Sequence, residues 1–259
     1  MNVLIKRALR AVLPARLLTT VQSVRARNHQ KHLLQEWGLD RAVHEFVSLR
    51  GRTVSNGPFM GMTYPPGSVF NRASIPFLLG TYELELHSVI EEAIAKRFER
   101  IIDIGCADGY YAVGLAMRTN ATVYAFDCEP REREYCRQMA LTNGVHQRVH
   151  VRSWCSGREL KSLATGRCLV ISDCEGYERE LFSPEVIAAL KDCDVLMELH
   201  GEAGTVAFKR FESSHDAQII PFTWAVKDYV PERWLKVARE VRPDNQVWAY
   251  LTPRRCDPC

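Results

Sequence analysis

Short apolar runs alternate with helical patterns from about residue 100 onwards. Hydrophobic residues recur at helical spacing in 110–118, 132–142, 185–190 and about 205–212. Strands that alternate with helices predict crossover connections and a doubly wound, mostly parallel α/β sheet covered on both faces. The predicted strands are 101–104, 122–126, 149–152, 168–172, 195–199, 218–222 and 247–251.

The pattern before residue 100 is different. Residues 1–13 read as an amphipathic helix that ends at Pro14, and a second helical stretch runs over about 15–48. Residues 51–67 are rich in Gly and Pro and predict a loop, whereas 82–97 again show helical spacing. We therefore expect an N-terminal helical and loop extension over 1–75 and a catalytic domain over 76–259.

Charge is unevenly distributed along the chain. Seven of the 34 Lys and Arg residues lie within the first 35 positions, where the chain has no Asp or Glu; the first acid is Glu36. The remainder carries 27 basic and 31 acidic residues, so it shows no basic surface typical of nucleic-acid binding. Residues 1–13 fit a packed or solvated helix, an Arg-rich organelle presequence, or a helix that contacts an anionic membrane surface.

No apolar run approaches the 18 residues of a spanning helix, and arginines interrupt every candidate signal-peptide core. Nine cysteines, an odd number, most of them in apolar segments, favour buried thiols over disulfides. Cys256 and Cys259 have no second pair and no nearby His, so they do not predict a zinc site. We expect a cytoplasmic protein whose residues 1–13 are the candidate membrane contact.

A strand that opens into small residues and then a helix forms the strongest local signal. Gly105, Ala107 and Gly109 allow a ligand to approach the backbone, and a helix N-terminus favours an anionic group. Asp127 follows the next predicted strand, where an acid can accept both hydroxyls of a ribose. The two features together predict a site for a nucleoside ligand that carries an anionic group.

Two cofactors fit such a site: a nicotinamide dinucleotide and S-adenosylmethionine. The dinucleotide fingerprint needs glycines where this chain has Ala107 and the bulky Tyr110, which favours S-adenosylmethionine. Tyr82, Tyr110 and Tyr111 are candidates to face the sulfonium, or to pack in the core. A nicotinamide-dependent oxidoreductase is the alternative enzyme, and a non-catalytic module that binds membranes is the alternative without chemistry.

Four titratable groups lie at the carboxyl ends of the fourth and fifth predicted strands: Asp173, Glu175, Glu198 and His200. Neighbouring strands of a doubly wound sheet end at the same edge, so these groups are expected to share one mouth. His200 or a carboxylate could act as general base for a hydroxyl, or Asp173, Glu198 and His200 could hold a divalent metal. In the alternative reading they cap helices and pair with nearby arginines, Arg179 or Arg210. Glu178 is expected to face solvent.

Several stretches resemble the FkbM family of S-adenosylmethionine-dependent methyltransferases. The most specific is the Asp-x-Glu-Gly-x-Glu element at 173–178. The chain departs from the family pattern at Ala107, in place of a glycine, and after Asp127, where Cys128 precedes Glu129. The other stretches are Gly80-Thr81-Tyr82-Glu83, Asp103-Ile104-Gly105-Cys106-Ala107-Asp108-Gly109-Tyr110-Tyr111, Val123-Tyr124-Ala125-Phe126-Asp127, Leu141-Thr142-Asn143-Gly144, Glu198-Leu199-His200 and Trp248-Ala249-Tyr250-Leu251.

The resemblance implies a class I, Rossmann-like, seven-stranded sheet whose last strand is antiparallel. It also implies transfer of a methyl group to a hydroxyl of a sugar, a glycan or a small metabolite. A divalent metal such as Mg²⁺ is an additional cofactor that Asp173, Glu198 and His200 themselves suggest, apart from the resemblance. His200, Asp173 and Glu175 are the catalytic candidates. The expected contacts to S-adenosylmethionine are Glu83, Asp103, Gly105, Ala107, Gly109, Tyr110, Asp127 and Asp173.

Overall fold

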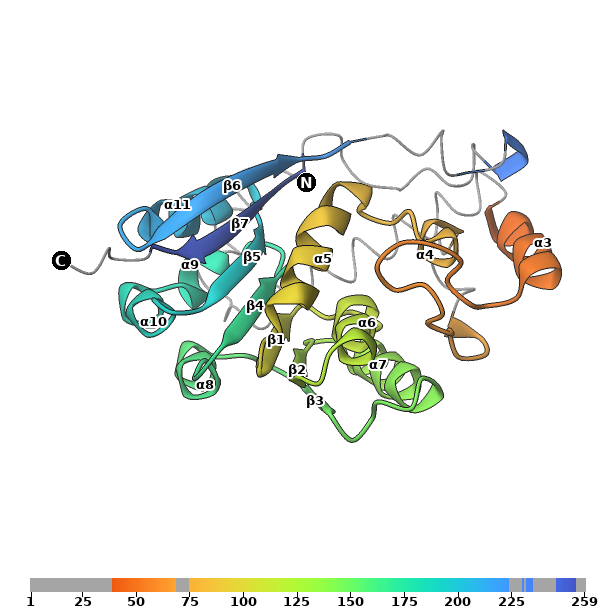
Figure 1. Cartoon of the computed structure of the whole chain (residues 1–259), viewed down its shortest axis with the longest axis horizontal. Coiled ribbons are helices and arrows are strands. Elements are labelled where there is room, and N and C mark those ends of the chain that lie inside the picture. The colour runs from red at the N-terminus through yellow and green to blue at the C-terminus, as the bar shows by residue number, and fades with distance from the viewer. Residues whose placement is uncertain (1–38, 69–74, 224–229, 231, 235–245, 255–259) are drawn as a thin grey trace, which may run out of the picture.

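A seven-stranded sheet in the order β3-β2-β1-β4-β5-β7-β6 forms the centre of the protein (Figure 1). The computed structural model describes residues 39–68, 75–223, 230, 232–234 and 246–254; the predicted helix 1–13 and the last two cysteines lie outside these residues. Of these seven strands, β7 alone runs opposite to the other six, which confirms the predicted α/β Rossmann-like sheet. The strands are β1 Arg100–Ile104, β2 Thr122–Phe126, β3 Val149–Arg152, β4 Cys168–Ser172, β5 Asp194–Glu198, β6 His215–Pro221 and β7 Val247–Pro253.

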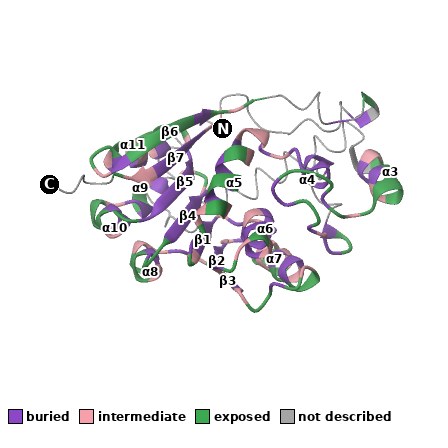
Figure 2. Cartoon of the chain, in the orientation of Figure 1, coloured by how far each residue is buried: buried purple, intermediate pink, exposed green. Residues whose placement is uncertain are grey.

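The central strands are buried on both faces. Every residue of β4 and β5 is buried, and Figure 2 shows these strands almost entirely in purple. Continuous apolar runs are typical of parallel strands covered by helices on both sides. Strand β6 begins at His215, three residues before the predicted start. It is an edge strand whose residues 216–219 are exposed. The sequence therefore shows an apolar pattern over only part of the strand.

Helices cover the two faces of the sheet in two hydrophobic clusters. Ile101 packs with α5, α6 and α7, whereas its neighbour Ile102 packs with α8 to α11 on the other face. This alternation follows from the two-residue period of a strand. The helices are α3 Leu39–Arg50, α4 Ile75–Leu79, α5 His87–Lys96, α6 Tyr110–Arg118, α7 Pro130–Thr142, α8 Gly157–Leu163, α9 Glu178–Leu181, α10 Pro184–Ala189 and α11 Gly201–Phe211, with 3₁₀ turns η2 Leu84–Leu86 and η4 Glu232–Trp234.

The described part of the N-terminal extension packs onto the sheet domain. Val43, Phe46 and Phe59 belong to the same hydrophobic cluster as α5, α6 and α7. Two hydrogen bonds fix the loop: Thr63 N–H donates to Asn143 Oδ1 at 2.7 Å, and Asn143 Nδ2 donates to Thr63 O at 2.8 Å. Asn143 is the C-cap of α7, so the predicted loop at 51–67 is held by the end of a domain helix.

Two further expectations concern the described residues. Their seven cysteines are all free thiols, as predicted, and five of them are buried. None of their helices has the combination of length and apolar character that crossing a bilayer requires.

Candidate functional site

The loop between β1 and α6 depends on two glycines for contacts within the protein. Gly105 has φ +88°, and a Cβ there would lie 1.7 Å from the carbonyl oxygen of Asp173. Gly109 has φ +93°, and a Cβ there would lie 2.7 Å from Cys136 Sγ. The glycines thus admit a neighbouring loop and a helix. The sequence predicts that these glycines let a ligand approach the backbone closely. Such a role would be in addition to the contacts within the protein.

Asp127 holds the same loop in place. Its Oδ2 accepts the backbone N–H of Ala107 at 3.0 Å, and its Oδ1 accepts that of Glu129 at 2.8 Å. Ala107 has φ +47°, a left-handed conformation that a non-glycine residue adopts only when its surroundings enforce it. Burial raises the pKa of the Asp127 carboxyl to about 6. The predicted ribose acceptor therefore also fixes the loop backbone.

A cavity opens at the carboxyl ends of β1 and β4. It encloses about 410 Å³ of space, the solvent at its mouth included. Its wall combines the Gly105 loop, acidic side chains and aromatic rings. The lining residues are Phe77, Tyr82, Glu83, Asp103, Gly105, Cys106, Ala107, Asp108, Tyr110, Tyr111, Ile171, Asp173 and Trp248.

Aromatic rings form one side of this cavity. Phe77 and Tyr82 stack with centroids 3.9 Å apart, and Tyr110 meets both edge-on at 5.2 and 5.4 Å. Tyr110 is buried at the first position of α6. The bulky residue that breaks the dinucleotide fingerprint thus belongs to an aromatic wall, where π-faces favour a cation.

Two buried acids face the same cavity. Asp103, the fourth residue of β1, is 3% exposed, and its Oδ2 is buried with no hydrogen-bond partner. Burial and the neighbouring charge of Asp173 raise the pKa of Asp103 to about 8. Glu83 is also buried, and it accepts a hydrogen bond from the hydroxyl of Tyr111. Its backbone is left-handed, with φ 47°, which explains why the predicted helix at 82–97 begins as a 3₁₀ turn.

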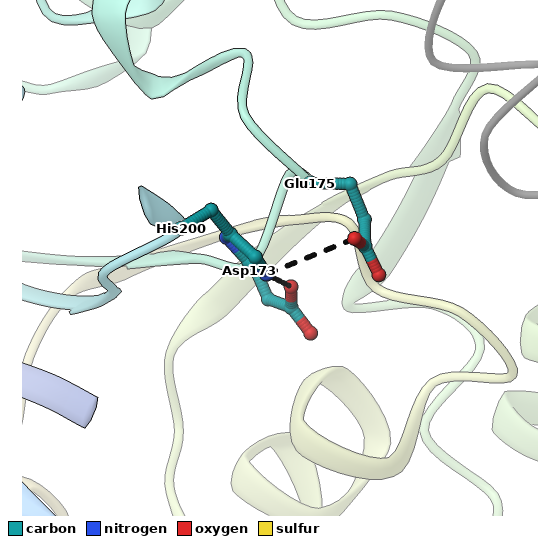
Figure 3. Close-up of side chains that lie close together, drawn as sticks. All are labelled: Asp173, Glu175 and His200. Atoms are coloured by element: carbon teal, nitrogen blue, oxygen red, sulfur yellow. Dashed lines mark ion pairs between the residues drawn. The ribbon is translucent and has the colours of Figure 1, made fainter. Parts of the chain in front are cut away.

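The four groups that follow β4 and β5 converge at one edge of the sheet, as predicted. His200 Nε2 lies 3.4 Å from Glu198 Oε2, 3.5 Å from Asp173 Oδ1 and 3.8 Å from Glu175 Oε2. Figure 3 shows Asp173 and Glu175 pointing toward the His200 ring. Asp173 also lines the cavity, so this cluster and the cavity adjoin.

The prediction that Glu178 faces solvent is wrong. This residue has no exposed surface, and its Oε1 lies 2.8 Å from His200 Nδ1. One signal for its role is present in the sequence, because Glu178 closes the Asp-x-Glu-Gly-x-Glu element that begins with Asp173. The alternative pairing with Arg210 is also absent, since this guanidinium donates to the carbonyl oxygens of Arg179 and Phe182.

Four carboxylates around one imidazole set its protonation. Burial opposes the charged form of His200, but the hydrogen bond to Glu178 and the charges of Asp173 and Glu198 outweigh it and raise its pKa to about 10. Burial and the charge of Asp173 raise the pKa of Glu198. A protonated imidazole donates protons, so the ring as described cannot take one from a hydroxyl. A base role for His200 would require another cation to displace its proton.

Ligand atoms of Asp173, Glu175 and His200 all lie within 4.8 Å of one another. The metal site predicted from the sequence combined Asp173, Glu198 and His200 instead. In the structure Glu198 is buried, whereas the Glu175 side chain is 58% exposed. Both carboxylates remain within reach of the same imidazole nitrogen.

Comparisons with known proteins give structural likeness only. No family model and no curated protein matches the chain. Precorrin-8W decarboxylase of Methanobacterium thermoautotrophicum is 18% identical, with 63% of this chain and 87% of that chain covered and a TM-score of 0.43. The bifunctional kinase-methyltransferase WbdD is 16% identical (81% and 46% covered; TM-score 0.49), and this chain thus spans less than half of it.

A putative O-methyltransferase from Klebsiella pneumoniae is 12% identical, with 87% of this chain and 96% of that chain covered and a TM-score of 0.44. At these identities and scores, the likenesses carry no argument about activity. Function therefore has to be argued from the cavity and from the cluster around His200.

Proposed function

We propose that this protein binds S-adenosylmethionine in the cavity at the ends of β1 and β4 and transfers its methyl group to a hydroxyl. One observation carries the proposal: a single cavity combines a helix-capping glycine loop, an aromatic wall and buried acids. The backbone N–H groups in the first turn of α6 suit the cofactor carboxylate, because those of Gly105, Ala107 and Gly109 are already bonded within the protein. The aromatic faces and the acids suit its sulfonium cation.

The residues present fit this cofactor. Asp103 Oδ2 is a buried acceptor without a partner beside the cavity, and an amino group is the donor that would satisfy it. Glu83 supplies a second acid on the same wall. Asp127 is tied to two backbone amides, so contact with a ribose would use the remaining lone pairs of its oxygens.

When bound, the cofactor supplies an electrophilic methyl group, and little covalent help is needed from the protein. The chain has to align the acceptor oxygen, exclude water and take up a proton. Asp173 belongs to both the cavity wall and the His200 cluster, so an acceptor held by Asp173 and Glu175 would lie beside the cofactor. A carboxylate of the cluster, or His200 once its own proton is displaced, would accept the proton of the hydroxyl.

The charge of the cluster narrows the acceptor. Asp173, Glu175, Glu178 and Glu198 all lie within ion-pair distance of His200, so acidic side chains outnumber the imidazole in this cluster. This surplus of negative charge disfavours a polyanion such as nucleic acid. Together with the resemblance to the FkbM family, it favours a neutral hydroxyl of a sugar, a glycan or a small metabolite. Docking of residues 1–13 on a membrane remains part of this proposal as the way to a lipid-linked acceptor.

Thermal-shift measurements on the full chain separate the candidate cofactors. S-adenosylhomocysteine at about 100 times its Kd should stabilise the fold by about 2.7 kcal/mol, and NAD should have no effect. Stabilisation by NAD alone would favour an oxidoreductase. A labelled-methyl transfer screen against glycan and metabolite libraries, with and without Mg²⁺, then identifies the acceptor. With that acceptor, His200→Ala should keep cofactor affinity and lower turnover by roughly 100-fold.

A further inference from the structure

The buried side chain of Glu178 gives His200 a defined orientation. Its Oε1 lies 2.8 Å from Nδ1, and the other ring nitrogen, Nε2, faces Asp173, Glu175 and Glu198. A carboxylate on one nitrogen that leaves the second nitrogen facing oxygen ligands is the usual arrangement around metal-binding histidines. We propose that a divalent transition-metal ion of the Mn²⁺ class binds between Asp173, Glu175 and His200.

The spacing of the ligand atoms fits one ion. One oxygen each from Asp173 and Glu175 and one nitrogen from His200 lie within 4.8 Å of one another (Figure 3). Ligand bonds of about 2.0–2.2 Å place neighbouring donor atoms about 3 Å apart and opposite ones about 4.2 Å apart. A small inward movement of one side chain therefore closes the site, and the largely exposed Glu175 is free to make it.

Glu198 is an independent sign that a cation belongs here. It is 3% exposed, its Oε2 lies 3.4 Å from His200 Nε2, its Oε1 accepts no hydrogen bond from an N–H group, and the acidic side chain of Asp173 lies within hydrogen-bonding reach of Glu198. Two acidic side chains buried in contact are costly unless a proton or a cation lies between them. A metal ion in the cluster would attract this carboxylate as a fourth ligand or as a neighbour in the electric field.

Charge balance points the same way. Four acidic side chains, Asp173, Glu175, Glu178 and Glu198, lie 2.8–3.8 Å from the single imidazole of His200. A divalent ion offsets the surplus of negative charge. An imidazole ligand favours Mn²⁺ or Zn²⁺ over Mg²⁺, which prefers oxygen ligands and retains several waters. The Mg²⁺ expected from the sequence is therefore replaced by a softer ion in this proposal.

The role of the ion rests on the proposed function, whereas its binding does not. Asp173 joins the cluster to the cofactor cavity, so an acceptor hydroxyl on the ion would lie next to the methyl donor. A bound divalent ion lowers the pKa of a coordinated hydroxyl and orients it for attack. The hydroxyl proton would pass to a carboxylate of the cluster or to solvent as the O–CH₃ bond forms and the S–CH₃ bond breaks, which leaves S-adenosylhomocysteine.

Binding of Mn²⁺ to the chelator-treated full chain, followed by electron paramagnetic resonance, tests the proposal. We expect one ion per chain, bound at micromolar concentration and displaced by Zn²⁺ more readily than by Mg²⁺. Glu175→Gln removes a ligand at an exposed position and should weaken binding at least tenfold. Glu178→Gln should weaken it about 10- to 100-fold through the orientation of His200.

Glu180→Gln is the matched control, because Glu180 is an exposed acid of the same short helix, α9; binding should not change. Absence of stoichiometric Mn²⁺ binding up to 1 mM overturns the proposal, and so does equal binding by wild type and Glu175→Gln. S-adenosylhomocysteine binding is measured on the same samples. Cofactor binding without Mn²⁺ binding rejects the metal site alone, and Mn²⁺ binding without cofactor binding rejects the methyltransferase alone.

Discussion

Glu178 Oε1 lies 2.8 Å from His200 Nδ1, and this carboxylate has no surface exposed to solvent. The pair joins the start of α9 to the N-cap of α11, two positions that lie 22 residues apart in the chain. A buried carboxylate fixes the plane of the ring and presents Nε2 to the three acids at the mouth. Glu178 therefore acts as a positioning residue for the cluster.

Substitution of Glu178 by Gln tests this positioning role in catalysis. Gln keeps the size of the side chain and an acceptor oxygen but removes the charge, so the hydrogen bond that orients the ring is weakened. We expect kcat for methyl transfer to fall about 10- to 100-fold, with the Kd of S-adenosylhomocysteine unchanged. Glu180→Gln, on the same helix but exposed, should leave both values at wild type. A parallel loss of cofactor affinity would indicate a general structural defect instead.

Gly105→Ala should disrupt the loop between β1 and α6 and destabilise the fold. The new Cβ would lie 1.7 Å from the carbonyl oxygen of Asp173 at a φ of +88°, so both contact and conformation are unfavourable. We expect a loss of about 3 kcal/mol or more in the free energy of unfolding. Gly144→Ala is the control, because Gly144 has φ +71° but nothing within 4 Å of its Cβ position. It should cost only about 1–2 kcal/mol; equal costs in urea unfolding would exclude the contact as the cause.

Asp103→Asn should change how stability depends on pH. The folded protein keeps the Asp103 proton up to about pH 8, whereas the unfolded chain releases it near pH 3.8. Between these values the folded state binds more protons, so the free energy of unfolding falls as pH rises. Asn carries no titrating proton and lacks this contribution, which is at most about 1.4 kcal/mol per pH unit.

Urea unfolding of the ligand-free protein at pH 5, 6, 7 and 8 measures this effect. The stability of Asp103→Asn relative to wild type should increase with each step. Affinity for S-adenosylmethionine should also be lower than in the wild type, since the amide, unlike the acid, cannot ionise to meet the amino group of a bound cofactor. Parallel curves for the two proteins would show that Asp103 is already ionised in the folded state.

Tyr82→Leu should separate recognition of the sulfonium from recognition of the rest of the cofactor. Tyr82 stacks on Phe77 and lines the cavity, and Leu keeps an apolar side chain there without a π-face. A cation–π contact of about 0.5–2 kcal/mol corresponds to about 2- to 30-fold in affinity. Isothermal titration should therefore show weaker binding of S-adenosylmethionine but little change for the uncharged thioether of S-adenosylhomocysteine.

Tyr135→Leu is the control for this experiment, because Tyr135 lies outside the cavity, on α7, where Arg131 donates to its hydroxyl. It should leave both affinities unchanged. An equal loss for the two cofactor forms in Tyr82→Leu would mean that the ring contributes shape and no interaction with the charge.

The sequence by itself determined the class of fold and the edge of the sheet that carries the polar groups. Apolar runs and helical spacing are local, so β2, β3 and β4 have the predicted bounds. The carboxyl ends of neighbouring parallel strands share one edge of the sheet, so the sequence alone predicts that Asp173 lies near His200. The observed start of β6, His215, differs from the predicted one because an exposed edge strand lacks a continuous apolar run.

Only the tertiary structure decided which acids approach which atom. The burial of Glu178 and its bond to Nδ1 depend on how α9 packs against the residues after β5, which no local pattern encodes. The need for glycine at 105 comes from a loop 68 positions away, since the carbonyl of Asp173 occupies the Cβ position. Local periodicity specifies elements, whereas site geometry arises from contacts between elements that only the folded chain brings together.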